Sequence, residues 1–176
     1  TLVNNTAFAT QPVVTIYDQD SNVVTSGSQS SQTVTLSATG ATTVAIGGSI
    51  SMDALEGVAN FTGKGVKLTG LVGARSLVAT ITSPNSVTAT ETVTITFGAA
   101  HHLNIASAAS GAANRIAFTN QPAIEVLDIS GNRVDDSAAT ISVTASAGNG
   151  ATLGGDTAMS ATGGIAYFNL NTNKLK

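Results

Sequence analysis

The feature that most limits the folds open to this chain is that its first part recurs later, with related residues in the same order. Phe8-Ala9-Thr10-Gln11-Pro12 is matched 110 positions later by Phe118-Thr119-Asn120-Gln121-Pro122. After a three-residue deletion the match continues at a shift of 107, where Gly57–Phe61 meets Gly164–Phe168. Ordered matches with a single gap indicate a repeated structural unit. Further matched pairs are Val14 with Ile124, Ile16 with Val126, Asp18 with Asp128, Asn22 with Asn132, Leu36 with Val143 and Met52 with Met159.

The repeat has a period of about 110 residues, which is long enough for one complete β-sandwich. We therefore expect two domains, residues 1–98 and residues 99–176, the first lacking its first strand and the second lacking its last strands. The polypeptide then either continues past both ends or is completed by a neighbouring chain that donates strands. Continuation is favoured, because the cuts fall inside repeats and not in linkers.

Alternation of apolar and polar residues with period two predicts β-strands throughout. Val34 and Leu36, for example, alternate with Thr33, Thr35 and Ser37. The composition agrees, since 42% of residues are hydrophobic, only 10% are charged, and 18 glycines supply turns. Without cysteine, no disulfide contributes to the fold. The residues expected to be buried are Val14, Ile16, Val34, Leu36 and Phe61 in the first copy, and Ile124, Val126, Ile141, Val143 and Phe168 in the second.

The expected fold class is all-β, with two packed antiparallel sheets and about seven short strands in each repeat. Other segments read as strands are Val58–Phe61, Leu77–Ile81, Val93–Phe97, Leu103–Ile105, Arg115–Phe118, Ile124–Val126 and Ile141–Val143. The segments expected to form turns between strands include Gly47-Gly48, Pro84-Asn85, Gly131-Asn132, Gly148-Asn149-Gly150 and Gly163-Gly164.

A motif shared by both copies carries a family resemblance. It runs Phe-x-x-Gln-Pro, alternating apolar residues, Asp-x-x-Gly-Asn and a late Gly-Val/Ile-Ala-x-Phe. Residues 118–134 match it best, whereas Ser21 replaces the turn glycine in the first copy. The pattern resembles the tandem bacterial Ig-like repeats of large cell-surface proteins, such as adhesins and S-layer-like proteins. The resemblance implies tandem immunoglobulin-like sandwiches of Greek-key topology in an extracellular setting, and it implies no ligand.

Several classes of function are disfavoured by the sequence. A net charge of −3 and 4% aromatic residues argue against nucleic-acid binding. No apolar stretch reaches the roughly 18 residues of a membrane-spanning helix, so we expect no membrane span in this segment. Catalytic signatures such as a Gly-x-Ser-x-Gly elbow or a phosphate-binding glycine loop are missing, and the chain is predicted not to be an enzyme.

One metal site is suggested by the sequence. Asp18, Asp20 and Asn22 have the alternate spacing with which side-chain oxygens on a tight turn coordinate calcium. The same spacing also fits a hairpin in which Asx side chains bind their own backbone. The hairpin is favoured, because no Glu completes the loop. Calcium is therefore the one cofactor that the sequence suggests.

Other polar residues have simple interpretations. Asn4 and Asn60 each begin an Asn-x-Thr acceptor sequence for N-glycosylation. His101 and His102 are neighbours on an expected strand, so their rings should point to opposite faces and should not share a metal. Asp135-Asp136 is expected to lie in a solvated loop, and Lys64, Lys67 and Arg75 at a solvated hairpin edge.

The sequence leaves three non-enzymatic roles open. The leading one is a structural repeat of an extracellular surface protein, acting as a stalk spacer or as a unit of a filament or lattice. Its partners would be neighbouring repeats or identical chains. The alternatives are an adhesin module that binds glycans or proteins, and a surface domain of a virion or phage. Adhesive tips usually present aromatic or charged anchors, which are few here, and this favours the spacer.

Overall fold

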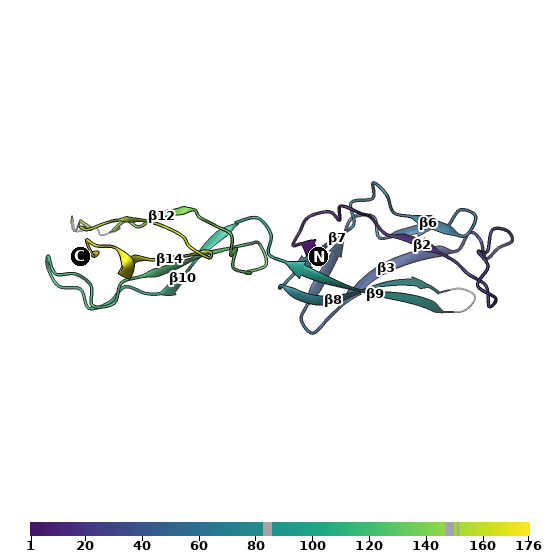
Figure 1. Ribbon diagram of the computed structural model, residues 1–176, viewed down its shortest axis with the longest axis horizontal. Coiled ribbons are helices and arrows are strands. Elements are labelled where there is room, and N and C mark those ends of the chain that lie inside the picture. The colour runs from purple at the N-terminus through teal and green to yellow at the C-terminus, as the bar shows by residue number, and fades with distance from the viewer. Residues whose placement is uncertain (83–85, 147–149, 151) are drawn as a thin grey trace. The chain divides into compact units, whose positions relative to one another are not determined.

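The computed structural model describes residues 1–82, 86–146, 150 and 152–176 (Figure 1). The chain divides into two compact units, Thr1–Gly98 and Ala99–Lys176. The turns predicted at Pro84-Asn85 and Gly148-Asn149 lie outside the described residues.

Unit 1 is built from short strands arranged in three sheets. Strands β1, β9, β8, β3 and β5 lie in that order in a five-stranded sheet, in which β1 runs parallel to β9 and the other neighbours are antiparallel. The pairs β2–β6 and β4–β7 form two small antiparallel sheets. The strands are β1 (Leu2–Val3), β2 (Val13–Thr15), β3 (Thr33–Thr39), β4 (Val44–Gly47), β5 (Ser51–Asp53), β6 (Val58–Asn60), β7 (Lys67–Gly70), β8 (Gly73–Ile81) and β9 (Val87–Thr96).

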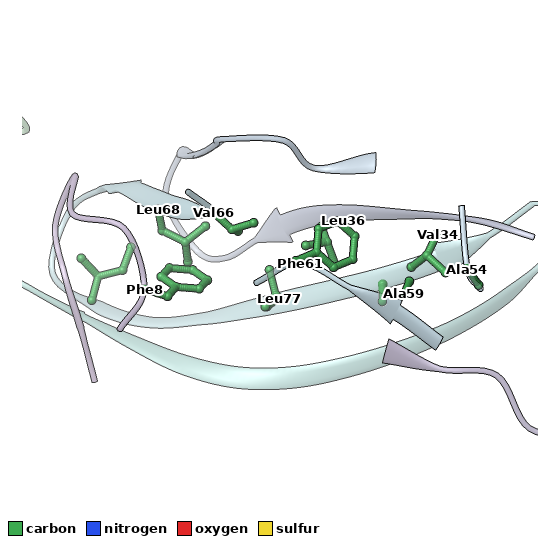
Figure 2. Close-up of a cluster of buried hydrophobic side chains, with 11 residues drawn as sticks. Phe8, Val34, Leu36, Ala54, Ala59, Phe61, Val66, Leu68 and Leu77 are labelled. Carbon is green, nitrogen blue, oxygen red and sulfur yellow. The ribbon is translucent and has the colours of Figure 1, made fainter. Parts of the chain in front are cut away.

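The core of unit 1 lies between the five-stranded sheet and the two smaller sheets (Figure 2). Val34 and Leu36 point inward from β3, while the Thr and Ser residues between them are exposed. They meet Phe61 and Leu68 from the opposite side, and all four side chains are buried. Burying one such side chain contributes about 1.5–3 kcal/mol, so this layer is the main source of the unit's stability.

Unit 2 also consists of short, mainly antiparallel strands. Strands β10, β11 and β14 form one antiparallel sheet, and β12 pairs with β13. Phe168 and Leu175 are among its most buried side chains. The elements are β10 (His102–Ser107), β11 (Ala123–Leu127), β12 (Thr140–Ser142), β13 (Ala158–Ser160), β14 (Ile165–Tyr167) and the 3-10 helix η1 (Phe168–Leu170).

The chain is thus an all-β, sandwich-like protein of mainly antiparallel sheets, as the alternation predicted. Corresponding strands in the two units pair in the same register. Val14 lies opposite Ala59 in β2–β6, and Ile124 lies opposite Ala166 in β11–β14. Likewise, the Thr33–Asp53 pairing of β3–β5 has its counterpart in the Thr140–Ser160 pairing of β12–β13. Each of these pairings agrees with the sequence shifts of 110 and 107.

Two parts of the second copy differ from the sequence interpretation. Arg115–Phe118 is not a strand, because Ala113 and Ile116 bridge a tight turn in which Arg115 has a positive φ of 62°. The alignment near the end also shifts by two residues. Phe8 donates to Val66 O and Phe118 donates to Leu175 O, so Leu175 corresponds to Val66, whereas the sequence shift of 107 would match it with Leu68. The extra residues lie after β14, beside η1.

Most of the predicted core is buried, including Ile124, Val126, Ile141 and Phe168 in unit 2. Val14, Ile16 and Val143 are only partly buried. Val14 and Ile16 line an open groove beside β2.

Candidate functional sites

The Asp18 turn closes a short hairpin after β2. The amide of Asp18 donates to Asn22 O at 2.9 Å, and the amide of Ser21 donates to Asp18 O at 3.1 Å. The carboxylate Oδ1 of Asp18 accepts the amides of Asp20 at 2.9 Å and Asn22 at 2.8 Å. Asn22 Nδ2 adds contacts to Oδ1 at 3.4 Å and to Oδ2 at 3.3 Å. The carboxylate therefore holds the turn together from inside.

These contacts favour the hairpin interpretation over the calcium site. Asp18 Oδ1 already accepts two backbone donors, and the Asn22 amide nitrogen faces the Asp18 carboxylate. The Asn22 backbone and side-chain hydrogen bonds, with a smaller contribution from Asp20, lower the pKa of Asp18 below its ordinary value of 3.8. Within the described residues, no three acidic or histidine side chains come together in a group that could hold a metal.

The second copy forms the same turn in different surroundings. Asp128 Oδ1 accepts the amides of Ser130 at 2.8 Å and Asn132 at 3.0 Å, and Asn132 Nδ2 donates to Oδ2 at 2.9 Å. Asp128 is 0% exposed, whereas Asp18 and its neighbours are exposed. Position i+3 of the turn has a positive φ in both copies, 65° at Ser21 and 83° at Gly131. A left-handed conformation costs a non-glycine residue about 1–2 kcal/mol, so Ser21 is strained.

Gln11 and Gln121 each clamp two backbone segments together, a role that the sequence motifs did not predict. Gln11 Nε2 donates to Phe8 O at 2.8 Å and to Val66 O at 3.1 Å, and its Oε1 accepts the Val66 amide at 2.8 Å. Gln121 does the same with Phe118 O at 3.1 Å and with both backbone groups of Leu175 at 3.0 Å. The sequence feature that could have indicated this role is the Gln-Pro pair that recurs in both copies. Both glutamines have a structural role, because their side-chain amides are hydrogen-bonded to backbone groups of the same unit.

The two glycosylation candidates differ in accessibility. Asn4 is 2% exposed, and its Oδ1 accepts the Gly70 amide at 2.9 Å. A glycan on Asn4 would have to displace this packing. Asn60 is exposed at the end of β6, and its Oδ1 accepts the Thr62 amide at 2.9 Å. The geometry therefore favours Asn60 as the accessible acceptor.

The histidine pair does not point to opposite faces as expected. The Nδ1 atoms of His101 and His102 lie 3.3 Å apart, and the rings meet edge to face. The physical reason is that His101 precedes β10, so the alternation of a regular strand does not apply to it. Both rings are exposed. Among the described residues, no further histidine or acidic side chain joins them in a group of three or more that could hold a metal.

Arg75 also departs from the expectation of a solvated basic cluster. Its side chain is 5% exposed and donates to the carbonyls of Leu71 at 2.7 Å and Ala74 at 2.6 Å, and to Thr42 Oγ1 at 2.7 Å. Its Nε has no hydrogen-bond partner among the described residues. The buried guanidinium is thus anchored by neutral oxygens and fixes the loop before β8. Lys64, in contrast, is exposed.

The acidic pair Asp135-Asp136 behaves as a surface loop. Arg133 Nε donates to Asp135 Oδ1 at 2.7 Å, with both side chains about half exposed. This contact raises the pKa of Arg133. An exposed ion pair of this kind contributes little to stability.

A groove of about 550 Å³ lies beside β2 in unit 1. Its lining is mainly apolar, and it runs between β2 on one side and β8 and β9 on the other. Apolar side chains that line it are Val14, Ile16, Ala79, Ile81, Val87 and Ala89. An apolar groove beside a sheet edge suits an extended polypeptide segment better than a polar small molecule.

No protein-family model, curated protein or solved structure matches this chain. The helix η1 is three residues long, and no helix among the described residues could cross a membrane.

Proposed function

We propose that this chain is a non-enzymatic structural repeat module of an extracellular surface protein. It serves as a spacer in a stalk or as a building block of a filament or lattice, with neighbouring repeats or identical chains as its partners. The observation that carries the proposal is that two successive units use the same turn and the same glutamine clamp at matching positions. Such reuse is expected when a chain extends by stacking copies of one module.

The polar chemistry supports this role. The carboxylate of Asp18, the amide of Gln11 and the guanidinium of Arg75 all bind backbone or hydroxyl groups of the protein itself. Side chains that hold turns and loops in this way are committed to structure. The resemblance of both motifs to tandem bacterial Ig-like repeats supports the same setting at a cell surface.

An adhesin module that binds glycans or proteins is the alternative. The apolar groove beside β2, with the exposed Tyr17 at its edge, is the observation that favours it.

Single-molecule stretching of the full chain tests the spacer role. Two unfolding events are expected, with extensions of at most about 320–350 Å for unit 1 and about 260–280 Å for unit 2, at 3.3–3.6 Å per residue. A glycan and protein binding screen on the same preparation is expected to give no saturable signal. Saturable binding that Tyr17→Ala abolishes would favour the adhesin, and stretching without resistance from either unit would contradict the spacer.

A further inference from the structure

The two histidines of the chain are neighbours in sequence, and the structure brings their ring nitrogens together. The sequence contains two histidines and no cysteine. Nδ1 of His101 and Nδ1 of His102 lie 3.3 Å apart, with the ring centroids 5.5 Å apart and the ring planes nearly perpendicular. Both rings are exposed. The imidazole nitrogens of the whole chain, which are its strongest ligands for transition metals, are thus gathered at one point of the surface.

The spacing of the two nitrogens is that of two ligands of one zinc ion. Imidazole nitrogens bind zinc at about 2.0–2.1 Å, and zinc prefers tetrahedral coordination. Two ligands at these distances from a tetrahedral ion lie about 3.3–3.4 Å from each other. The observed separation of 3.3 Å therefore already suits zinc, and the exposed rings need only turn so that both lone pairs point at one ion. A square-planar ion holds neighbouring ligands closer together and fits less well.

The contact between the rings leaves both nitrogens open to a metal. As the rings stand, the Nδ1 of one histidine donates a hydrogen bond to the lone pair of the other. A neutral imidazole carries its proton on either nitrogen, so the donating ring can hold its proton on Nε2 instead. Both Nδ1 atoms then present lone pairs, and a zinc ion takes the place of the shared proton while each ring stays neutral.

His102 lies on the outer face of its sheet. Leu103 is opposite Val126, which is buried, so Leu103 is on the core side of β10. Side chains alternate along a strand, and His102 and Asn104 are therefore on the other side. The contact of Asn104 Nδ2 with Glu125 Oε2, at 3.0 Å, lies on this outer face. Access to His102 thus does not depend on what packs against the core side of β10.

The backbone at the histidine pair is held in place. The His101 amide donates to Leu127 O at 2.8 Å, and His102 lies opposite Leu127 in the β10–β11 ladder. Two ligands on an anchored backbone lose less conformational freedom when they bind one ion than two ligands on a free chain. The pair is therefore arranged in advance to chelate.

The charges around the pair do not oppose a cation. Glu125 lies on the same outer face as His102, one pair further along the ladder on that face. Arg133 bridges Leu127 from the other side, but its guanidinium is paired with Asp135 at 2.7 Å. A divalent ion at the histidines thus meets one nearby carboxylate and a cation that is already balanced.

We propose that His101 and His102 together bind one zinc ion through their Nδ1 atoms, with the remaining coordination positions open to water or to a ligand from outside the chain. A site with two protein ligands and open positions is exchangeable, unlike the closed four-ligand sites that hold structural zinc. The site does not depend on the proposed role as a repeat module, because it uses residues of unit 2 alone.

Titration of the full chain with Zn²⁺ tests the site, using protein prepared without a histidine tag and followed by isothermal calorimetry. One ion is expected to bind per chain, and a large excess of Mg²⁺ should not displace it, because Mg²⁺ prefers oxygen ligands. His101→Ala and His102→Ala each remove one arm of the chelate, and each is expected to weaken zinc binding at least about tenfold. Since both rings are exposed, these variants should keep their fold, as hydrogen exchange can check.

The matched control is Asn104→Ala, which changes an exposed residue on the same face of β10. It is expected to bind zinc like the wild type. Unchanged affinity in either histidine variant would overturn the shared site, because one ring alone would then account for the binding. Equal weakening by Asn104→Ala would also overturn it, since the loss would not be specific to the imidazoles.

NMR of the imidazole nitrogens gives a readout that a change in folding would not imitate. Zinc is expected to shift the ¹⁵N signals of both Nδ1 atoms together, saturating at one equivalent, and to leave both Nε2 atoms protonated. Binding through Nε2, or a shift in only one ring, would overturn the assigned geometry. Zinc should also raise the unfolding temperature of unit 2 and not that of unit 1, because the ion binds the folded start of β10. Stabilisation of unit 1 alone would place the ion elsewhere and overturn the proposal.

Discussion

Asp18 and Asp128 accept equivalent backbone hydrogen bonds, yet Asp18 is exposed to solvent and Asp128 is fully buried. The turn is therefore specified by the local sequence, in which an Asn follows the Asp four residues later. What differs is the strand edge that leads into it. In unit 2, β10 and His101 cover that edge as far as Leu127, whereas no strand among the described residues lies along the same edge of β2.

We therefore expect the same Asp turn to contribute differently to the stability of the two units. An exposed turn carboxylate can exchange its hydrogen bonds for water, but a buried one cannot do so without leaving donors unpaired. The copy with the covered edge should thus depend on its Asp far more than the open copy does. The predictions below test the difference between the units, beginning with the largest effect.

Core truncation should separate the two units most strongly. Leu36 is 1% exposed in β3, whereas its counterpart Val143 is only partly buried. Leu36→Ala is expected to lower the free energy of unfolding of unit 1 by about 2–5 kcal/mol. Val143→Ala should cost unit 2 clearly less. Urea unfolding followed by hydrogen exchange at β3 and β12 measures each unit, and equal losses would contradict the difference in packing.

Removal of the turn carboxylates gives the next largest contrast. Asp128→Ala leaves the amides of Ser130 and Asn132 without their buried acceptor and is expected to cost unit 2 about 2–3 kcal/mol. Asp18→Ala is the matched control and should have a much smaller effect, because water replaces its carboxylate. Amide exchange at Ser130 and Asn132 should accelerate more than at Asp20 and Asn22. Equal acceleration of amide exchange in the two variants would contradict the expected difference between the buried and the exposed carboxylate.

An exchange of turn residues should have the smallest effect, with opposite signs in the two units. Ser21→Gly relieves a positive φ of 65° and should stabilise unit 1 by about 0.5–1 kcal/mol, the strain relieved less the added entropy of the unfolded chain. Gly131→Ser should destabilise unit 2 by a similar amount. Thermal unfolding of both variants checks the signs, and a stabilising Gly131→Ser would refute the argument from backbone strain.

The sequence predicted the parts of the fold that follow from local rules. The alternation around Val34 and Leu36 placed a strand and its buried face correctly, because side chains of a strand alternate between faces. Arg115–Phe118 was wrongly read as a strand, since a short apolar run does not reveal a turn closed by Ala113 and Ile116. The two-residue shift near Leu175 depended on hydrogen bonds between distant segments.

Among the candidate sites, the Asp18 turn was predictable and its surroundings were not. The spacing of Asp18, Asp20 and Asn22 fits both a calcium site and a hairpin. The structure favours the hairpin, because the backbone and side-chain N–H groups of Asn22 point at the Asp18 carboxylate. Burial of Arg75 could not be inferred, because its acceptors are backbone carbonyls that carry no sequence signal. The groove lies along a side of β2 on which no strand is found among the described residues, and no pattern within β2 predicts this.

The parallel pairing of β1 with β9 has a mechanical consequence for unit 1. Leu2 lies opposite Ile95 and Val3 opposite Thr96, and the Asn4 amide donates to Thr96 O at 3.0 Å. Tension applied between Thr1 and Gly98 pulls these two strands in opposite directions along their own axes. Their hydrogen bonds are then loaded together in shear, whereas an antiparallel hairpin such as β8–β9, pulled apart at its open end, would unzip one bond at a time. A short terminal strand can thus set the force at which the whole unit yields.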